Sequence, residues 1–451
     1  MEREPEAVQI IGGGLAGCEA AWQVASRGIR AVLYEMRPDV QTPAHQSGAL
    51  AELVCSNSLG SLLPGRAPGL LKEELRRLGS LVLRCAESAA VPAGRALAVD
   101  RDAFSDGIER SISSHPHIEV RREEVAEIPP DRITVVASGP LTSSALAEGI
   151  ARLFGQQQLY FWDAMAPIVQ AESIDMGVAF RASRYEDGES DYINCPMDAA
   201  EYRRFVAELV QARQAPLRGY ELEDRRYFEA CLPIEVLAKR GEQALAYGPL
   251  RPIGLTDPRT GKRPHAVVQL RQDNLAGSLY NLVGFQTNLS WDEQRRVFGL
   301  IPGLEQAEWV RFGQMHRNTF INSPELLTPC LSWKRDPRLY FAGQIVGTEG
   351  YMGSTASGLL AGVNASRVAR GLAAVVPPCT TMLGALVRYV TTPQASSFQP
   401  MKPNHGLLPP LENQPRRKRE RGDAYAVRAL EDLQSFIAES GVLGDLIGDG
   451  G

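Results

Sequence analysis

The sequence predicts an α/β fold in which a Rossmann-like parallel sheet is interrupted by an inserted α+β domain. First, a β-like run, a glycine-rich turn and a helical run follow one another within the first 35 residues. Second, two further β-like runs, 132–138 and 339–342, each end in glycine, and the middle of the chain has β-like and helical runs of its own. Nucleotide-binding segments at opposite ends imply a discontinuous domain. We therefore expect residues 1–160 and 321–451 to form one domain and residues 161–320 to form the insertion.

The composition is that of an ordinary globular protein. The 451 residues are 44% hydrophobic and 22% charged, which excludes disorder for most of the chain. The formal net charge of −5 restricts any nucleic-acid contact to a local basic patch. No apolar run is long enough for a membrane span, the first residues are acidic rather than signal-like, and we expect the seven cysteines to be free thiols. A cytoplasmic location follows as an expectation.

The first expected elements are a strand over 8–11 and a glycine-rich turn. The turn reads Gly12, Gly13, Gly14, Leu15, Ala16 and Gly17. A helix is expected from Cys18 to Arg27, and a second strand from Arg30 to Tyr34 ends at Glu35. In such a turn the first glycine permits the bend, the second lets the backbone approach a pyrophosphate, and the third lets helix and strand pack closely. The carboxylate of Glu35 can accept hydrogen bonds from the ribose hydroxyls and disfavours a 2′-phosphate, so this site fits FAD or NAD better than NADP.

Two later segments favour FAD. The strand over 132–138 ends at Gly139, and the strand over 339–342 ends at Gly343 and Gln344. A glycine-rich loop that contains Tyr351 follows, and a helix of small residues is expected over 355–371. A helix N-terminus at this place would stabilise negative charge on a reduced isoalloxazine ring. We therefore predict a FAD-binding domain of the glutathione-reductase type.

Two cysteines stand where a thiol could be activated. Cys55 is followed by Ser56 and Asn57, which predicts a helix N-cap region whose partial positive charge favours a thiolate. Cys231 lies two residues before Pro233, which can open a helix, so Cys231 is also expected near a helix start. Each cysteine can instead be a small buried apolar residue, and Cys195 has the weaker case for a role. No spacing of cysteines or histidines indicates a metal site.

Basic residues gather at two places. The run over 416–421 contains five Lys or Arg residues and precedes an amphipathic helix expected over 423–439. Lys262 and Arg263 form a shorter group. Both groups are candidates for gripping a nucleic-acid backbone, although a charge run is more often a solvated surface.

Ten phrases, spread over nearly the whole chain, are similar to those of a single family. They are Gly12–Gly17, Cys55–Leu59, Gly69–Glu74, Tyr192–Met197, Phe228–Glu235, Asp257–Lys262, Val267–Arg271, Val283–Thr287, Met315–Phe320 and Phe341–Gln344. The sequence thereby resembles the folate- and FAD-dependent tRNA uracil-5-methyltransferases, the TrmFO family. The resemblance implies that the uridine at position 54 in the T-loop of tRNA becomes 5-methyluridine. The methylene would come from 5,10-methylenetetrahydrofolate and the hydride from FADH2, recharged by NADH or NADPH.

The resemblance also implies roles for individual residues. Carbon 5 of uracil is a poor nucleophile, and a thiolate that adds to carbon 6 creates an enolate able to attack the methylene carbon. Cys231 is implied as the thiol that adds to carbon 6. Cys55 is implied as the second thiol, a base for the carbon 5 proton or a guard for the flavin, and the two roles could be exchanged. Tyr351 is a candidate to face the pterin, which we expect to stack on the flavin.

Two other functions stay open at this point. One is a related flavoprotein that uses FAD and folate to modify the wobble uridine of tRNA together with a partner protein. The other is a non-catalytic, tRNA-binding flavoprotein that tolerates loss of both thiols. The sequence leaves the oligomeric state, the choice between NADH and NADPH, and the identity of the attacking thiol undecided.

Overall fold

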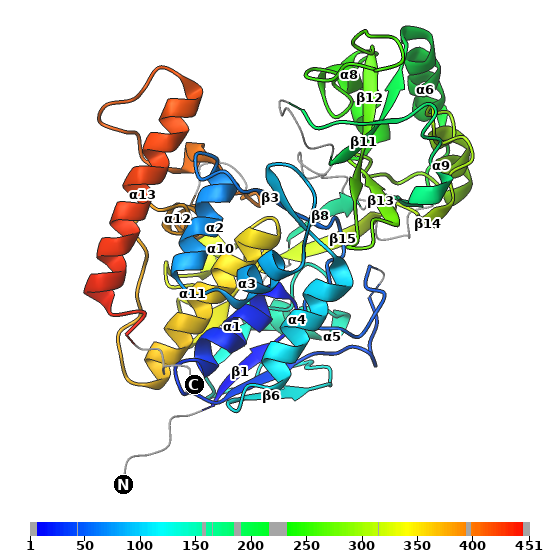
Figure 1. Ribbon diagram of the computed structural model, residues 1–451. Helices are drawn as coiled ribbons and strands as arrows, with labels where there is room; N and C mark the ends of the chain where they lie inside the picture. The colour runs from blue at the N-terminus through cyan, green and yellow to red at the C-terminus, as the bar shows by residue number, and fades with distance from the viewer. Residues whose placement is uncertain are drawn as a thin grey trace.

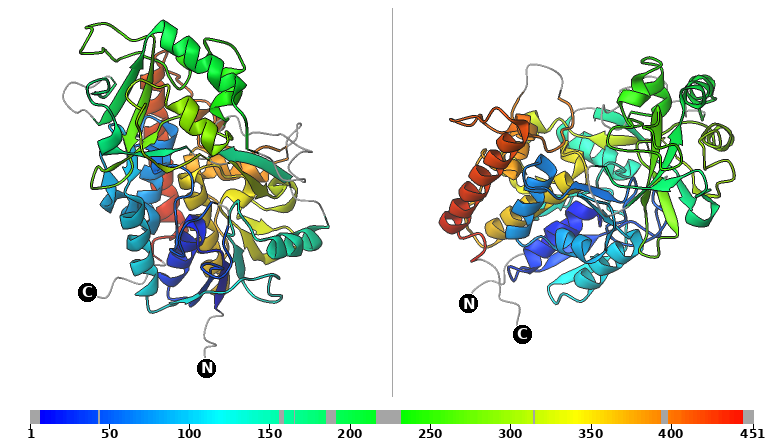
Figure 2. Two further views of the ribbon diagram at one scale, coloured as in Figure 1. Left: turned by 90° about the vertical axis from the view of Figure 1, so that its right-hand side faces the viewer. Right: turned by 45° about the horizontal axis from the view of Figure 1, so that its top comes forward.

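The chain folds into two lobes (Figure 1). The computed structural model describes residues 7–42, 44–155, 159–164, 166–184, 191–215, 232–313, 315–393 and 398–444, and only the backbone for 159–164 and 315–318. We call residues 7–155 and 321–444 the parallel-sheet lobe and residues 166–313 the insertion lobe. In Figure 2, a quarter turn from the first view, the insertion lobe lies above the other lobe.

A six-stranded sheet is the centre of the parallel-sheet lobe. Its order is β16-β17-β7-β1-β2-β6, with every neighbouring pair parallel except β16 and β17. The strands are β1 (Val8–Ile11), β2 (Ala31–Tyr34), β6 (Ile118–Arg121), β7 (Thr134–Val136), β16 (Ser332–Trp333) and β17 (Asp336–Phe341). The central strands β1, β2 and β7 are short, largely buried and mostly apolar runs, as expected for parallel strands covered on both faces. The predicted Rossmann-like fold is confirmed.

Helices α1 (Leu15–Ala25) and α11 (Tyr351–Ala369) pack closely against each other. A Cβ added at Gly358 would lie 2.7 Å from Ala16 Cα, and one at Gly362 would lie 2.6 Å from the Ala20 carbonyl oxygen. The backbones therefore approach as closely as they do only because two positions of α11 lack a side chain. Both helices begin earlier than predicted, because glycines precede them and open the first turn three or four residues upstream.

The other elements of this lobe surround these two helices. They are β3 (Ser58–Ser61), α2 (Ala67–Arg77), α3 (Leu81–Ser88), β4 (Ala90–Val91), β5 (Ala96–Val99), α4 (Arg101–Ser113), α5 (Ser144–Phe154), α10 (Ser323–Leu326), the 3-10 turns Gln344–Val346 and His405–Leu407, α12 (Met382–Thr391) and α13 (Lys418–Ser440). Buried Glu74 of α2 accepts hydrogen bonds from the backbone N–H groups of Met382 (2.6 Å) and Leu383 (2.8 Å), and so caps α12. Burial raises the pKa of Glu74 to about 8.

A second, antiparallel sheet of six strands forms the insertion lobe, in the order β10-β11-β12-β13-β9-β14. Its strands are β9 (Ile168–Gln170), β10 (Phe180–Arg181), β11 (Tyr192–Met197), β12 (Ala266–Gln272), β13 (Leu279–Leu282) and β14 (Trp309–Arg311). The helical elements are the 3-10 turn Ala171–Ser173, α6 (Ala199–Gln211), α7 (Ile234–Ala238), α8 (Ala244–Tyr247) and α9 (Trp291–Phe298). The sheet and helices enclose a separate apolar core.

A two-stranded ribbon links the lobes. Strand β8 (Leu159–Ala164) leaves the parallel-sheet lobe, and β15 (Met315–Phe320) returns antiparallel to it. Leu159 pairs with Phe320, so the predicted domain boundaries after residues 160 and 320 fall at the same end of this ribbon. The boundaries themselves stay a prediction.

Two local predictions are wrong. Cys55 does not precede a helix, because the residues after it form β3, and the next helix, α2, begins only at Ala67. The serines there make local turns, in which the Ser56 hydroxyl accepts from the Ser58 N–H, rather than a helix cap. At the other end of the chain, α13 begins at Lys418 instead of 423, which places most of the basic run inside its first turn.

The close contact of α1 and α11 gives a stability prediction. Replacement Gly362→Ala forces Cβ against the Ala20 carbonyl, and we expect it to lower the free energy of unfolding by about 1–3 kcal/mol in urea titrations. Gly107→Ala is the matched control, because Gly107 lies inside α4 and its added Cβ would meet Cys85 at an ordinary 3.7 Å. The control should be neutral or stabilise by about 0.5–1 kcal/mol. Equal effects of both replacements would refute the packing argument.

Candidate functional site

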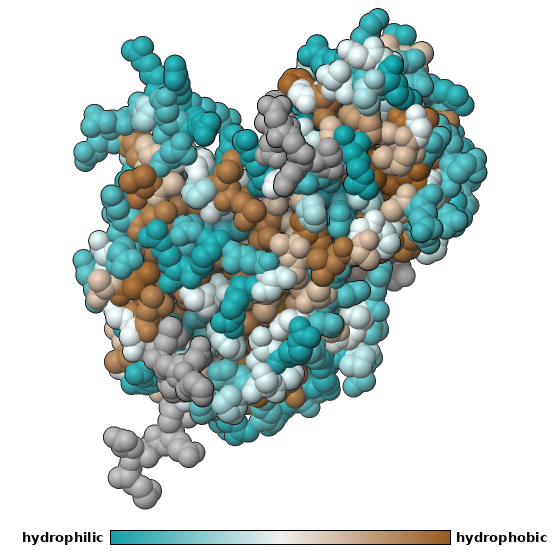
Figure 3. Space-filling model, in the orientation of Figure 1, coloured by the Kyte–Doolittle hydropathy of each residue, from teal (hydrophilic) through white to brown (hydrophobic). Residues whose placement is uncertain are grey.

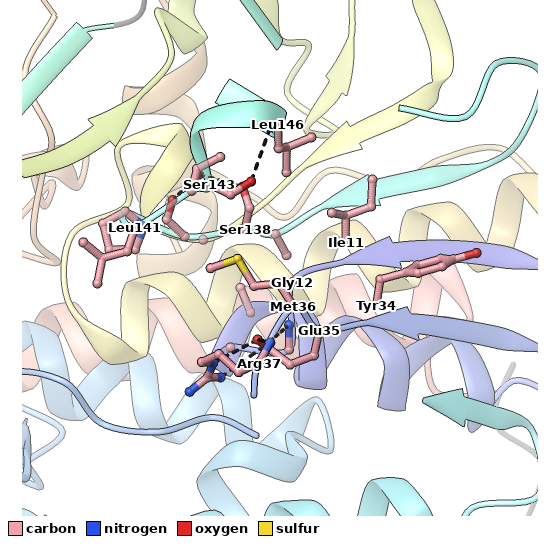
Figure 4. Close-up of a pocket in the computed structure, with 18 of the residues that line it drawn as sticks. Ile11, Gly12, Tyr34, Glu35, Met36, Arg37, Ser138, Leu141, Ser143 and Leu146 are labelled. Atoms are coloured by element: carbon pink, nitrogen blue, oxygen red, sulfur yellow. Dashed lines mark hydrogen bonds and ion pairs between the residues drawn. The ribbon is translucent and has the colours of Figure 1, made fainter. Parts of the chain in front are cut away.

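A pocket lies at the carboxyl ends of β1, β2, β7 and β17, where ligands bind in open parallel sheets (Figure 4). It encloses about 970 Å³, part of it open to solvent. Ten of the predicted cofactor residues line it: Gly12, Gly13, Gly14, Leu15, Ala16, Glu35, Gly139, Gly343, Gln344 and Tyr351. The eleventh, Gly17, packs behind the turn against the Gly12 carbonyl, where any Cβ would overlap it.

The glycine turn leaves room where a phosphate would lie. Gly12 has a φ of +108°, and a Cβ there would lie 2.5 Å from the Ala137 carbonyl oxygen, so only glycine fits. A Cβ at Gly14 would meet no atom within 4 Å, which shows that this position faces open space. Gly14 is the N-cap of α1 and has no side chain to occupy the first N–H groups of the helix. These groups fit a pyrophosphate, which the partial positive charge of the helix end also favours.

Glu35 directly follows β2 and is held by an arginine that the sequence analysis missed. Its carboxylate accepts hydrogen bonds from the Gly13 N–H (3.0 Å) and from Arg37 Nε (2.9 Å). Burial by itself would raise the pKa of Glu35, but the hydrogen bonds and charge of Arg37 outweigh it and lower the pKa. The acid is therefore ionised at neutral pH, and Figure 4 shows it beside Gly12 with the Arg37 guanidinium. A second acid, Glu52, also pairs with Arg37 at 3.2 Å.

The other end of the pocket is formed after β17. Gly343 has a φ of +85°, and a Cβ there would lie 3.0 Å from that of Ala16. The Gln344 side chain donates to Glu349 at 2.9 Å, which fixes the start of the loop that leads into α11. Tyr351 is the first residue of α11, and Ser354 lies in its first turn. Two helix N-termini, those of α1 and α11, thus border one pocket, an arrangement suited to a ligand that carries negative charge at two places.

Cys55 lies at the edge of this pocket. Its backbone N–H donates to the Tyr351 hydroxyl at 2.8 Å, and the preceding residue, Val54, lines the pocket. Burial raises the pKa of Tyr351, so its hydroxyl stays protonated. The cysteine is half-buried. Its position depends on contacts with residues distant in sequence, such as Tyr351, which neither helix propensity nor motif spacing predicts.

The other predicted residues lie elsewhere. Cys231 falls outside the described residues; the chain resumes at Leu232, and Pro233 is the N-cap of α7. Cys18 and Cys195 are fully buried, and desolvation raises the pKa of both thiols, which removes them as candidates for a thiolate. The basic side chains of residues 262, 263 and 416–419 are exposed, and none of them lines the pocket.

The described residues lack two features, a metal-binding cluster and a membrane-spanning helix. No cluster of three or more His, Cys, Asp or Glu side chains in this part of the chain could hold a metal ion. None of the helices described here has the length and apolarity to cross a bilayer.

Comparison of the sequence with known proteins gives close relatives. The profile of the family described as Glucose inhibited division protein A matches residues 7–373. The methylenetetrahydrofolate–tRNA-(uracil-5-)-methyltransferase TrmFO of Heliobacterium modesticaldum is 57% identical over 96% of this chain and 98% of its own length. The enzyme of the same name from Geobacter sulfurreducens is also 57% identical, over 96% of this chain and 99% of its own.

Among solved structures, GidA of Aquifex aeolicus has a similar fold. One crystal form superposes with a TM-score of 0.71, covering 98% of this chain and 76% of GidA, at 17% sequence identity. A second form gives a TM-score of 0.70 at 16% identity. At this level of identity the likeness concerns the fold alone.

Glu35 offers a direct test of the pocket. We expect Glu35→Gln to weaken FAD binding by roughly ten- to a hundredfold, because one hydrogen bond to a charged group contributes about 1.5–3 kcal/mol. The measurement is flavin absorbance per protein after dialysis, followed by titration of the apoprotein with FAD. Glu119→Gln is the control, since Glu119 lies on β6, away from the pocket lining. Full FAD affinity in Glu35→Gln would show that this carboxylate does not hold the ligand.

Proposed function

The chain belongs to the TrmFO family of methylenetetrahydrofolate–tRNA-(uracil-5-)-methyltransferases, within the wider Glucose inhibited division protein A family, and from this we propose how its reaction is carried out. It is a flavoprotein enzyme that methylates carbon 5 of uracil in tRNA with methylenetetrahydrofolate. High identity over nearly all of both chains supports this activity over modification of the wobble uridine and over a non-catalytic role. We propose that the target is uridine 54 of the T-loop and that the enzyme acts in the cytoplasm.

FAD fits the pocket, and the residues that would hold it are those of the two glycine-rich ends. The turn at Gly12–Gly17 and the N-terminus of α1 would bind the pyrophosphate, and Glu35 would accept the ribose hydroxyl protons. The loop from Gly343 to Tyr351 would lie against the isoalloxazine ring. When bound and reduced, FAD supplies the hydride that completes the methyl group, and we propose NADH or NADPH as its reductant.

The contact between Tyr351 and Cys55 is the observation that carries the mechanism. It brings a thiol, in a chain segment that lines the pocket, to the end at which the flavin ring would lie. We propose that one thiolate adds to carbon 6 of uracil, so that carbon 5 of the enolate attacks the folate methylene. The second cysteine, as its thiolate, then takes the proton from carbon 5, and tetrahydrofolate leaves the methylene carbon. The first sulfur leaves carbon 6 once that methylene carbon has received the hydride that reduced FAD would supply. Cys231 is proposed for the attack and Cys55 for the proton transfer, with the exchanged assignment as the alternative.

The target base must leave the folded T-loop to reach a thiol and the flavin. The start of α13 is proposed to grip the tRNA backbone during this step. Arg417, Lys418 and Arg419 are exposed there, and cations at a helix N-terminus oppose the helix dipole. The unfavourable electrostatic energy of cations at a helix N-terminus is offset when tRNA phosphates lie beside them. Figure 3 shows hydrophilic surface over this end of α13 and a hollow between it and the insertion lobe, which carries the other exposed pair, Lys262 and Arg263.

The thiol assignment is tested by replacing Cys55. We expect Cys55→Ala to lower the rate of methyl transfer to a T-loop transcript by about 10²–10⁴-fold, with FAD content unchanged. Cys379→Ala is the matched control, a half-buried cysteine that does not line the pocket. A transcript with cytidine at position 54 should accept no methyl group. Wild-type turnover by Cys55→Ala would remove this thiol from the mechanism.

The proposed tRNA grip is tested by charge removal. We expect Lys418→Ala/Arg419→Ala to raise the KM for tRNA several-fold and to leave kcat nearly unchanged. The slope of log KM against log salt should also become shallower, by roughly one for each lost phosphate contact. Arg152→Ala, which removes an exposed arginine of α5, should change neither quantity. An unaltered salt slope in the double variant would contradict backbone contact at this helix.

A further inference from the structure

Three consecutive peptide carbonyls around Cys55 each accept a hydrogen bond from a guanidinium. Arg101 donates to the carbonyls of Leu53 and Cys55, the latter at 3.0 Å, and Arg311 donates to the carbonyl of Val54 at 2.8 Å. With the N–H of Cys55 bound to Tyr351, both peptide groups that flank the cysteine are held by side chains. Such a loop has little freedom to rotate, so the backbone of Cys55 is fixed by residues remote in sequence.

The two arginines come from different lobes. Arg101 is the first residue of α4 in the parallel-sheet lobe, and Arg311 is the last residue of β14 in the insertion lobe. Arg101 also forms an ion pair with buried Asp273, which follows β12 of the insertion lobe, at 3.0 Å. The loop around Cys55 is therefore a part of the contact between the lobes rather than of either lobe alone.

A buried polar network continues this contact. The Asn57 side-chain oxygen accepts from Arg271 Nε (3.1 Å) and from Asn281 Nδ2 (2.9 Å), and Asn281 also donates to Asp273 at 2.9 Å. All four of these side chains are more than nine-tenths buried. Charges in such surroundings interact strongly, because little water screens them.

The charged groups that face Cys55 are mostly positive. Arg101, Arg271 and Arg311 each interact electrostatically with the cysteine, and Asp273 is the carboxylate that pairs with one of them, Arg101. The phenol of Tyr351 is the other titratable neighbour and stays neutral because burial raises its pKa. The surplus of guanidinium charge favours an anion at the sulfur over a neutral thiol.

We propose that Arg101 and Arg311 are positioning residues that hold the Cys55 peptide between the two lobes and favour the thiolate of Cys55. The inference rests on the proposed catalytic role of Cys55 but concerns a property of the thiol that can be measured without catalysis. It replaces the helix terminus expected from the sequence as the source of positive charge. It also makes full activation of the thiol depend on contact between the lobes, since Arg311 belongs to one lobe and Cys55 to the other.

The test is the pH dependence of Cys55 alkylation in the FAD-loaded enzyme, with iodoacetamide and quantification of the peptide that contains Cys55 by mass spectrometry. We expect Arg311→Met to slow alkylation at pH 7 by roughly tenfold and to move the midpoint of the rate profile to higher pH. Arg311→Lys should restore most of the rate, because it keeps the charge. Asp273→Asn should act in the opposite direction and speed alkylation, because it removes the opposing charge. Arg203→Met, which removes an exposed arginine of α6 from the same lobe, is the control and should match the wild type.

Each outcome decides between activation and mere structural support. Unchanged midpoints in Arg311→Met and Asp273→Asn, with flavin content and melting temperature retained, would overturn the proposal. If Arg311→Met does not fold, the other two variants still test the proposal. Activation by charge predicts faster alkylation of Cys55 in Asp273→Asn and a rate close to that of the wild type in Arg311→Lys, whereas a purely structural role of the arginines predicts no faster alkylation in Asp273→Asn. Normal methyl transfer by Cys55→Ala would refute the catalytic role of Cys55 alone, since the alkylation profile would still report on the two arginines.

Discussion

The approach of α11 to α1 is the contact on which the site depends. Gly358 and Gly362 face the backbone of α1 at Ala16 and Ala20, and no side chain separates the two helices there. Because they pack this closely, their N-termini meet at the same ends of the parallel strands. A Rossmann-like sheet with one such helix end is a nucleotide site. The second helix end, supplied by residues more than 300 positions downstream, extends the pocket to Tyr351 and so to the loop that carries Cys55.

Much of the parallel-sheet lobe could be predicted from the sequence, because its signals are local. A glycine turn between an apolar run and a helical run predicts β1, α1 and the pocket beside them, and the residues predicted there line it. The environment of Cys55 could not be predicted in this way. The arginines that hold it lie 46 and 257 residues away from the carbonyls that they bind, and no periodicity connects such positions. The serines and asparagine after Cys55 are typical of a helix cap, whereas the Asn57 side chain takes part in the contact between the lobes instead.

The phrases shared with relatives have different physical tasks, which resemblance alone does not separate. In the phrase Gly69–Glu74, Lys72 donates to the Ser61 carbonyl at 3.0 Å and Glu74 caps α12, so this phrase holds elements together without lining the pocket. Gly69 has the same role, since a Cβ there would overlap the backbone of Leu63. The phrase at Cys55–Leu59, by contrast, combines the thiol proposed for catalysis with the buried amide of Asn57. A phrase that holds elements together and a phrase that carries a candidate catalytic thiol thus lie close to each other in one chain.

The ribbon of β8 and β15 has an evolutionary consequence. Its strands pair residue by residue from Leu159 with Phe320 to Ala164 with Met315, so the chain leaves the parent fold and rejoins it at neighbouring points. An inserted lobe whose two ends adjoin can be lengthened, shortened or replaced without shifting the register of the parallel sheet. The inserted stretch also carries Arg311, so a replacement of this stretch would remove a contact with the loop of Cys55 while leaving the parallel sheet intact.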